Sequence, residues 1–252
     1  MRRQLGRLLR TSARRIGLGT SRVAIDTRGA HDAAAIDDVE IWRRVAPFTM
    51  TSPERIQALV DSVRHLERHH VAGAFVECGV WRGGSMMAAA LALAGATNRE
   101  LFLFDTYEGN PAPGDPDVDH RGVSAAQQLA ADPSRTAHIS AVAHLEDVRR
   151  NMASTGYPES LIHYVAGNVE DTIPAMAPDR IALLRLDTDW YASTRHELQH
   201  LFPRMVSGGV LIVDDYGHWR GARQAVDEYL DSTGVRLLLC RIDYTGRIAV
   251  VP

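Results

Sequence analysis

The sequence predicts an α/β fold, a doubly wound and mostly parallel sheet that ends in an antiparallel hairpin. From about residue 74 onward, short apolar runs of strand length alternate with helical segments. Glycines follow several of these runs, which marks turns from strand to helix. Such alternation favours right-handed βαβ units, in which helices cover both faces of a parallel sheet.

The 252 residues suit one domain of this kind with a short appendage. Residues 1–35 show no sustained period, and we expect a flexible basic N-terminal tail. Residues 36–72 are predicted to form a helical N-terminal segment, because Ser52 and Pro53 supply an N-cap and a first-turn proline ahead of apolar residues at helical spacing. Residues 73–252 then form the sheet domain.

Each expected element follows from a short apolar run or a helical period. The parallel strands are expected at Ala74–Val80, Leu101–Asp105, Leu161–Ala166, Ile181–Leu186 and Val210–Val213, and the helices at Ser85–Ala94, Val142–Thr155, Thr194–Met205 and Ala222–Leu230. Two terminal strands, Arg236–Ile242 and Arg247–Val251, flank a Thr-Gly turn that would join them as a hairpin. Ligands bind such sheets at the carboxyl ends of the strands, so the residues that follow each strand are the functional candidates.

Composition excludes several classes of function. A net charge of -3 gives no general attraction to nucleic acid or to an anionic membrane. All 28 basic residues are Arg, so the chain has neither a Schiff-base lysine nor a phosphate-loop lysine. No apolar run approaches the ~20 residues that cross a bilayer, and the basic N-terminus lacks the apolar core of a secretory signal. Cys78 and Cys240 form no disulfide framework or zinc motif, which fits a cytoplasmic location.

A glycine-rich loop, ECGVWRGGS (77–85), follows the first strand. Glycines let the backbone approach a ligand closely, and the next helix presents free N–H groups. A dinucleotide fingerprint requires a second glycine where Trp81 stands. The carboxylate of Glu77 would repel a pyrophosphate but would attract the cationic sulfonium and ammonium groups of S-adenosylmethionine. A purely structural turn from strand to helix is the alternative.

Two further strand ends indicate a nucleoside cofactor. Asp105 ends the second strand, where a carboxylate commonly accepts both ribose hydroxyls. This position suits NAD as well as S-adenosylmethionine. After the third strand, the segment GNVEDTIP (167–174) lies where an adenine pocket would be, although Asp171 has a helix N-cap as its structural alternative.

Four carboxylates follow the fourth and fifth strands: Asp187, Asp189, Asp214 and Asp215. Like charges this close raise one another's pKa and destabilise the fold unless a cation compensates. All-oxygen ligands favour a hard ion such as Mg²⁺ or Ca²⁺ over zinc. Acidic helix caps that face solvent are the alternative. The pattern therefore indicates a hard-cation site at this edge of the sheet.

From Phe48 to Tyr229 the chain resembles the macrocin O-methyltransferase (TylF/MycF) family, class I enzymes that methylate sugar or aromatic hydroxyls of natural products. The matching stretches are FTMTSPER (48–55), FVECGVWRGGS (75–85), LFLFDTYEG (101–109), VEDTIP (169–174), RLDTDWYASTRHEL (185–198) and GGVLIVDDYGHWRGARQAVDEY (208–229). The resemblance implies the class I methyltransferase Rossmann-like fold with a helical N-terminal lid, and S-adenosylmethionine and Mg²⁺ as cofactors. Relatives assemble through their N-terminal segments, so a homo-oligomer is expected.

The resemblance also implies a role for each matching residue. Asp187, Asp214 and Asp215 match the magnesium ligands, and Asp189 matches the proposed general base. Thr188 departs from the Gly found in several members. The implied cofactor contacts are Thr49, Met50, Ser52, Arg55, Glu77, Gly79, Val80, Trp81, Ser85, Asp105, Thr106, Asn168, Val169, Glu170, Asp171 and Asp187.

The expected function is methyl transfer from S-adenosylmethionine to a hydroxyl of a small molecule, either a sugar or a catechol-like compound. The metal would orient and acidify the hydroxyl, and Asp189 would accept its proton. His218, Trp219, Tyr191 and Tyr216 are candidates for the acceptor pocket, with core or capping roles as alternatives. A nicotinamide-dependent oxidoreductase, a non-catalytic S-adenosylmethionine-binding protein and a metal-dependent hydrolase are the alternative functions.

Overall fold

The structure, a computed structural model, describes residues 37–93, 98–131 and 137–252. The basic tail expected over residues 1–35 lies outside the described residues. Within the described ranges, no helix is both long enough and apolar enough to span a bilayer.

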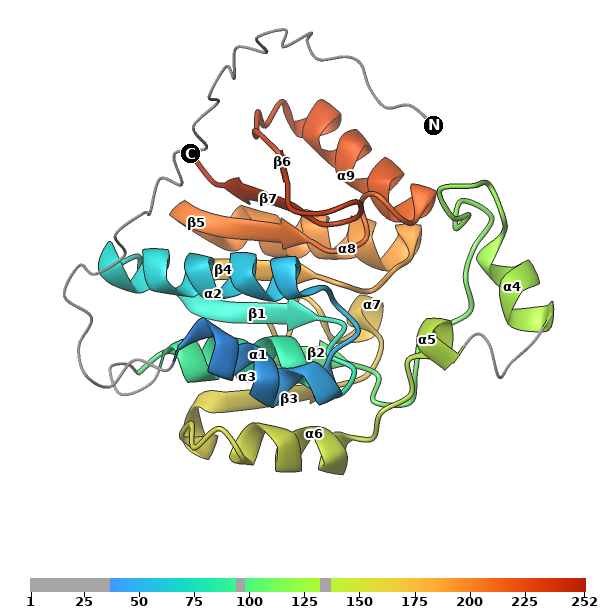
Figure 1. Ribbon diagram of the computed structural model, residues 1–252. Helices are drawn as coiled ribbons and strands as arrows, with labels where there is room; N and C mark the ends of the chain where they lie inside the picture. Colours follow the sequence, from blue (N-terminus) through green and yellow to red (C-terminus); the bar gives the residue numbers. More distant parts are fainter. Residues whose placement is uncertain (1–36, 94–97, 132–136) are drawn as a thin grey trace, which may run out of the picture. The chain divides into compact units, whose positions relative to one another are not determined.

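The described residues form one seven-stranded sheet in the order β3-β2-β1-β4-β5-β7-β6 (Figure 1). Its strands are β1 Ala74–Cys78, β2 Leu101–Asp105, β3 Ile162–Ala166, β4 Ile181–Leu186, β5 Met205–Val213, β6 Cys240–Arg241 and β7 Arg247–Val250. Strands β1 to β5 pair in parallel, whereas β7 runs antiparallel to both β5 and β6. The mostly parallel sheet with a terminal antiparallel hairpin is confirmed.

Helices cover both faces of the sheet (Figure 1). One face carries α1 Asp38–Val45, α2 Pro53–Arg68, α3 Gly84–Ala92 and α6 Leu145–Ala153, and the other carries α7 Val169–Thr172, α8 Tyr191–Leu201 and α9 Arg220–Thr233. Successive β1 residues therefore point into different apolar clusters, Phe75 into one and Val76 into the other. Because both faces are buried, β1 and β4 are buried along their whole length and are apolar except for Glu77 and Arg185, with no alternation of apolar and polar residues.

The first turn of α2 forms as its residues dictate. The Ser52 side chain accepts a hydrogen bond from the Arg55 backbone N–H at 3.2 Å, and Pro53 occupies the first helical position. This cap fixes where the chain turns from an extended segment into the helix. Residues 49–51, just before it, therefore have a defined path beside the strand ends.

The 106–124 loop is held by carboxylates and leads to two short helices that periodicity did not predict, α4 Ala125–Ala131 and α5 Ala137–Ser140. Asp117 accepts hydrogen bonds from the backbone N–H groups of Gly114 at 2.7 Å and Tyr191 at 2.8 Å. Asp119 accepts from the backbone N–H groups of Arg121 and Val123. These contacts bring a loop without regular structure against the start of α8, next to the carboxyl ends of the strands.

Several predicted boundaries were wrong. The helix expected from residue 142 begins only at Leu145, after the N-cap His144. The strand expected over 236–242 pairs with β7 only at Cys240 and Arg241, because Leu238 and its neighbours pass the sheet edge without hydrogen-bonding to it. The fifth strand is longer than the expected Val210–Val213, since β5 begins at Met205 and includes Ser207, Gly208 and Gly209.

Candidate functional site

A cavity of about 430 Å³ lies at the carboxyl ends of β1, β4 and β5, and we name it the strand-end cavity. Its volume is within the range of about 300–1,000 Å³ typical of small-molecule sites. A second space of about 30 Å³, the side cavity, shares Gly79, Asp105 and Asn110 with it and extends to the start of α7. Both occupy the sheet edge at which this fold binds ligands.

The glycine-rich loop forms one wall of the strand-end cavity. Gly79 has a φ of +83°, and a Cβ at this position would lie 2.0 Å from the carbonyl oxygen of Asp187. Only glycine combines this conformation with so close an approach of two strand ends. Trp81 also adopts a positive φ, and Gly83 caps α3 in the left-handed conformation.

Asp105 fixes this loop in place. Its Oδ2 accepts hydrogen bonds from the backbone N–H groups of Val80 at 2.6 Å and Trp81 at 2.9 Å, and its Oδ1 accepts from Tyr107 N at 2.8 Å. Oδ1 accepts from only one backbone N–H group and has room for a second donor, so these bonds are compatible with a ribose hydroxyl. Asp105 lines both cavities, which is the position that its predicted role requires.

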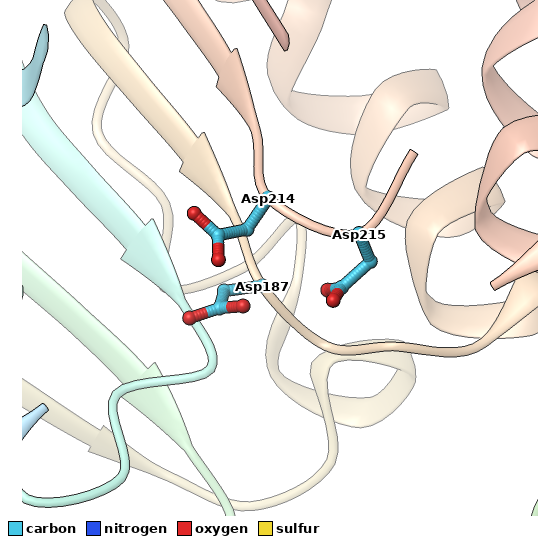
Figure 2. Close-up of side chains that lie close together, drawn as sticks. All are labelled: Asp187, Asp214 and Asp215. Atoms are coloured by element: carbon cyan, nitrogen blue, oxygen red, sulfur yellow. The ribbon is translucent and has the colours of Figure 1, made fainter. Parts of the chain in front are cut away.

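Three aspartates converge at the ends of β4 and β5 (Figure 2). One carboxylate oxygen from each of Asp187, Asp214 and Asp215 lies within 4.8 Å of the others. The cause is strand register: Leu186 pairs with Val213 in parallel, so the residues that follow them emerge side by side. We name these three residues the aspartate cluster.

A buried arginine, Arg185, lies beneath the aspartate cluster with only 3% of its surface exposed. Its Nη1 donates to Glu77 Oε1 at 2.6 Å and Asp187 Oδ2 at 2.7 Å, and its Nη2 lies 2.7 Å from Asp214 Oδ1. One guanidinium therefore partly offsets three carboxylates, of which Glu77 and Asp214 are buried and Asp187 is partly exposed. Burial raises the pKa of Glu77 to about 7 even though Arg185 opposes the shift. Glu77 faces Arg185 and lines neither cavity.

Asp189 lines the strand-end cavity beside the aspartate cluster. Asn110 Nδ2 donates to its Oδ2, Trp219 Nε1 donates to its Oδ1 at 2.8 Å, and its own backbone N–H donates to Asp215 Oδ2. Burial and the nearby charge of Asp187 raise the pKa of Asp189 to about 7. A carboxyl group with a pKa near the working pH is suited to accept and release a proton.

The charge balance and donor set of the site fit a hard divalent cation. Five carboxylates (Glu77, Asp187, Asp189, Asp214 and Asp215) face two guanidiniums, Arg55 and Arg185. Burial and mutual repulsion raise the pKa of Asp187 and of Asp215 well above the ordinary range. Asp214 Oδ1 is buried without a well-oriented hydrogen bond. Oxygen ligands at this spacing and with this excess charge suit Mg²⁺.

Added Mg²⁺ is expected to raise the melting temperature more at pH 8 than at pH 6. Because the pKa of Asp189 is raised to about 7, the stabilisation from its bound proton is fully present below the ordinary aspartate pKa and is lost as the pH rises through 7. Above that pH the negative charge of Asp189 adds to that of the aspartate cluster, and Mg²⁺ meets less competition from protons. At about 100 times its Kd it would add ~2.7 kcal/mol, or about 5–10 °C. Thermal melts with Mg²⁺ or EDTA measure this; equal shifts at both pH values would contradict it.

The segment before α2 forms the roof of the strand-end cavity. Thr49, Met50, Thr51 and Arg55 line it, and Thr51 Oγ1 donates to Asp214 Oδ2 at 3.2 Å. A Cβ on Gly84 would lie 2.5 Å from the Phe48 carbonyl oxygen, so the approach to this segment packs directly on the first turn of α3. The roof consequently touches both the glycine-rich loop and the aspartate cluster.

Aromatic side chains line the side of the cavity nearest Asp189. The rings of His218 and Trp219 lie 4.7 Å apart, and the Tyr244 hydroxyl lies 3.0 Å from His218 Nδ1. Tyr244 lines the cavity and is 54% exposed. The sequence had indicated His218 and Trp219, while Asn110, Ile139, Ala141 and Tyr244 had given no signal.

Tyr191 and Tyr216, the other acceptor candidates, line neither cavity. The Tyr191 hydroxyl donates to Glu228 at 2.7 Å, and the Tyr216 hydroxyl donates to Asp227 at 2.6 Å. Both side chains thus interact with residues of α9. Their proposed place in the acceptor pocket is not supported by the structure.

The structure brings most of the predicted cofactor contacts to the two cavities. The strand-end cavity is lined by Thr49, Met50, Arg55, Gly79, Val80, Trp81, Ser85, Asp105 and Asp187. The side cavity adds Thr106, Asn168, Val169 and Glu170. Three predicted contacts line neither cavity: Ser52 caps α2, Glu77 pairs with Arg185, and Asp171 is exposed on α7.

The strand order, the glycine-rich loop and the cavity at the β1/β4 switch define a class I methyltransferase fold. The macrocin O-methyltransferase (TylF) family model matches residues 15–249, and the chain belongs to this family. The chain is therefore an S-adenosylmethionine-dependent O-methyltransferase.

Characterised relatives agree with this assignment. The chain is 35% identical over 208 residues to the 8-demethyl-8-(2,3-dimethoxy-alpha-L-rhamnosyl)-tetracenomycin-C 4'-O-methyltransferase of Streptomyces olivaceus, covering 81% of this chain and 76% of that protein. It is 31% identical over 225 residues to the mycinamicin III 3''-O-methyltransferase of Micromonospora griseorubida, covering 87% and 84%. The solved structure of the O-methyltransferase NovP is similar with a TM-score of 0.70 and 30% identity over 81% of this chain and 82% of that one.

Proposed function

We propose that this enzyme transfers the methyl group of S-adenosylmethionine to a hydroxyl of a sugar carried by a larger natural product, with Mg²⁺ in the aspartate cluster and Asp189 as general base. The tetracenomycin relative is named for methyl transfer to a rhamnosyl-bearing compound and the mycinamicin relative for transfer at a 3'' position, which favours a sugar over a free catechol as acceptor. A cytoplasmic location and assembly into a homo-oligomer belong to the same proposal.

The position of Asp189 carries this proposal. Its carboxylate lies between the aspartate cluster and the aromatic side of the strand-end cavity. Asn110 and Trp219 each donate to one of its oxygens, which fixes the plane of the carboxyl group. An acceptor hydroxyl in this region would therefore meet an oriented base with a pKa of about 7.

The chain's own residues would perform distinct parts of the reaction. Asp187, Asp214 and Asp215 would hold the cation, which when bound supplies positive charge that eases deprotonation of the hydroxyl. Asp189 would take up the proton, and the roof residues Thr49 and Met50 would exclude water from the reacting groups. The protein's main contribution would be to hold the acceptor oxygen, the methyl carbon and the sulfur in line.

Cofactor recognition would be divided between the two cavities. Asp105 is proposed to accept from the ribose, and Asn168, Val169 and Glu170, at the start of α7, to lie beside the adenine. Val80, Trp81 and Ser85 would border the methionine part in the strand-end cavity. The three predicted contacts that line neither cavity would act indirectly. Ser52 would act through the roof, Glu77 through Arg185, and Asp171 through α7.

The acceptor class is tested with methyl-labelled S-adenosylmethionine and three compounds: an aromatic 6-deoxyhexoside, its free aglycone, and catechol. Label is expected only in the glycoside, and mass-spectrometric fragmentation should place it on the sugar. Calorimetry with S-adenosylhomocysteine and NAD provides an independent control, with binding expected only for the former. Label in the aglycone or catechol alone would contradict the proposed acceptor; tight NAD binding without S-adenosylhomocysteine binding would contradict the cofactor.

A further inference from the structure

Arg55 joins the roof of the cavity to two separate carboxylates. It belongs to the first turn of α2, and only 12% of its side chain is exposed. Its Nη1 pairs with Asp214 of the aspartate cluster, and its Nε lies 3.0 Å from Asp243 Oδ2 in the turn between β6 and β7. One side chain thus connects a helix, a proposed metal ligand and the terminal hairpin.

The hairpin turn is shaped to receive Arg55. Asp243 Oδ1 accepts from the backbone N–H groups of Thr245 at 2.9 Å and Gly246 at 2.7 Å, and its Oδ2 accepts from Ser52 Oγ at 2.9 Å. A Cβ on Gly246 would lie 2.9 Å from Arg55 Cδ, so a larger residue would press on the aliphatic part of the Arg55 side chain. Asp243 therefore holds both the cap and the first-turn arginine of α2.

The same contacts tie the roof to the aspartate cluster. Thr51 and Arg55 both line the strand-end cavity, and both contact the Oδ2 atom of Asp214. A divalent cation at the cluster would draw on the same carboxylate. The positive charge of Arg55 and that of the cation are therefore in competition for Asp214, while the roof depends on Arg55 for its attachment.

We propose that Arg55 is a positioning residue that couples the two ligands: it holds residues 49–55 over the S-adenosylmethionine site and competes with the divalent cation for Asp214, with Asp243 sharing its charge. This inference rests on the proposed metal role of the cluster. Removal of Arg55 therefore tightens binding of the cation and weakens binding of S-adenosylmethionine. Removal of the Asp243 charge leaves Arg55 with Asp214 alone, and this weakens the binding of both ligands.

The test measures Mn²⁺ affinity by electron paramagnetic resonance and S-adenosylhomocysteine affinity by calorimetry, each on the full chain. Arg55→Met is expected to tighten Mn²⁺ about tenfold and to weaken S-adenosylhomocysteine about tenfold, which is within the usual range for coupled sites. Asp243→Asn is expected to weaken both. Arg55→Lys should keep Mn²⁺ affinity near that of the wild type, and Arg68→Met, at an exposed position on the same helix, should change neither.

Weaker Mn²⁺ binding in Arg55→Met, or unchanged S-adenosylhomocysteine binding, would overturn the proposal. If a thermal melt shows that Arg55→Met is not folded, Asp243→Asn provides the test instead. Unchanged affinity of Asp243→Asn for either ligand would then overturn the proposal. A wild-type protein that binds no Mn²⁺ would contradict the metal role and this coupling together. A wild-type protein that binds both ligands, with variants that match it, would contradict the coupling alone.

Discussion

Asp189→Asn is expected to lower kcat by about 10²–10⁴-fold, the usual contribution of a general base. Asparagine preserves the size of the side chain, and its oxygen still accepts from Trp219, but the amide cannot take up a proton. The Asn110 amide can present its oxygen to the new N–H group only by giving up its hydrogen bond to the Ile139 carbonyl, so a small loss of stability accompanies the loss of the base. Single-turnover methyl transfer from labelled S-adenosylmethionine measures the loss.

The affinity for S-adenosylhomocysteine, measured by calorimetry, should remain within about threefold, because Asp189 acts on the acceptor side of the cavity. Asp231→Asn, an exposed position at the end of α9, is the matched control and should leave kcat unchanged. A kcat of Asp189→Asn within tenfold of the wild type would show that another group accepts the proton.

The sequence predicted the sheet and the aspartate cluster because both depend on local pattern and simple topology. Apolar runs define β4 and β5, and the residues directly after them are acidic. Once two parallel strands are adjacent, their carboxyl ends meet, so Asp187 falls beside Asp214 without any knowledge of the loops. The strand boundaries were less accurate where pairing ends at the sheet edge, as at Cys240.

The partners of the acidic groups could not be predicted in the same way. Asn110 reaches Asp189 through a loop with no regular period, held in place by Asp117 and by the start of α8. Its location depends on tertiary hydrogen bonds between residues far apart in the chain. Arg185 did leave a signal, because a charged residue inside the apolar run IALLRL must pair with buried acids.

Glu77 illustrates how burial changes the interpretation of a motif. From the sequence, its carboxylate suits the positive charges of S-adenosylmethionine. In the structure, Arg185 already pairs with it, and both are almost completely buried. Glu77 can thus order Arg185, which in turn contacts Asp187 at the edge of the strand-end cavity. An acidic residue at a strand end indicates a charged site, but the structure decides whether it contacts the ligand or a neighbour.

Removal of the metal with EDTA is expected to lower kcat by about 10²-fold or more, since a bound cation contributes several kcal/mol to such a reaction. Asp215→Asn should reproduce this loss and abolish Mn²⁺ binding. Asp215 is the most informative ligand to replace, because Asp214 also contacts Thr51, Arg55 and Arg185. The exposed Asp179→Asn, at the opposite edge of the sheet, is the control.

Three readouts separate the metal role from a structural one: kcat with and without Mg²⁺, Mn²⁺ binding, and the melting temperature in EDTA. Burial and the charges of Asp189 and Asp214 raise the pKa of Asp215, so the neutral variant should melt at the same temperature as the wild type in EDTA, or higher. Full activity in EDTA would show that charge repulsion in the cluster is relieved by protons and arginines alone. We expect Asp215→Asn to show a lower kcat, no Mn²⁺ binding and an undiminished melting temperature in EDTA. These three results together would mean that the cation is needed for the reaction and not for folding.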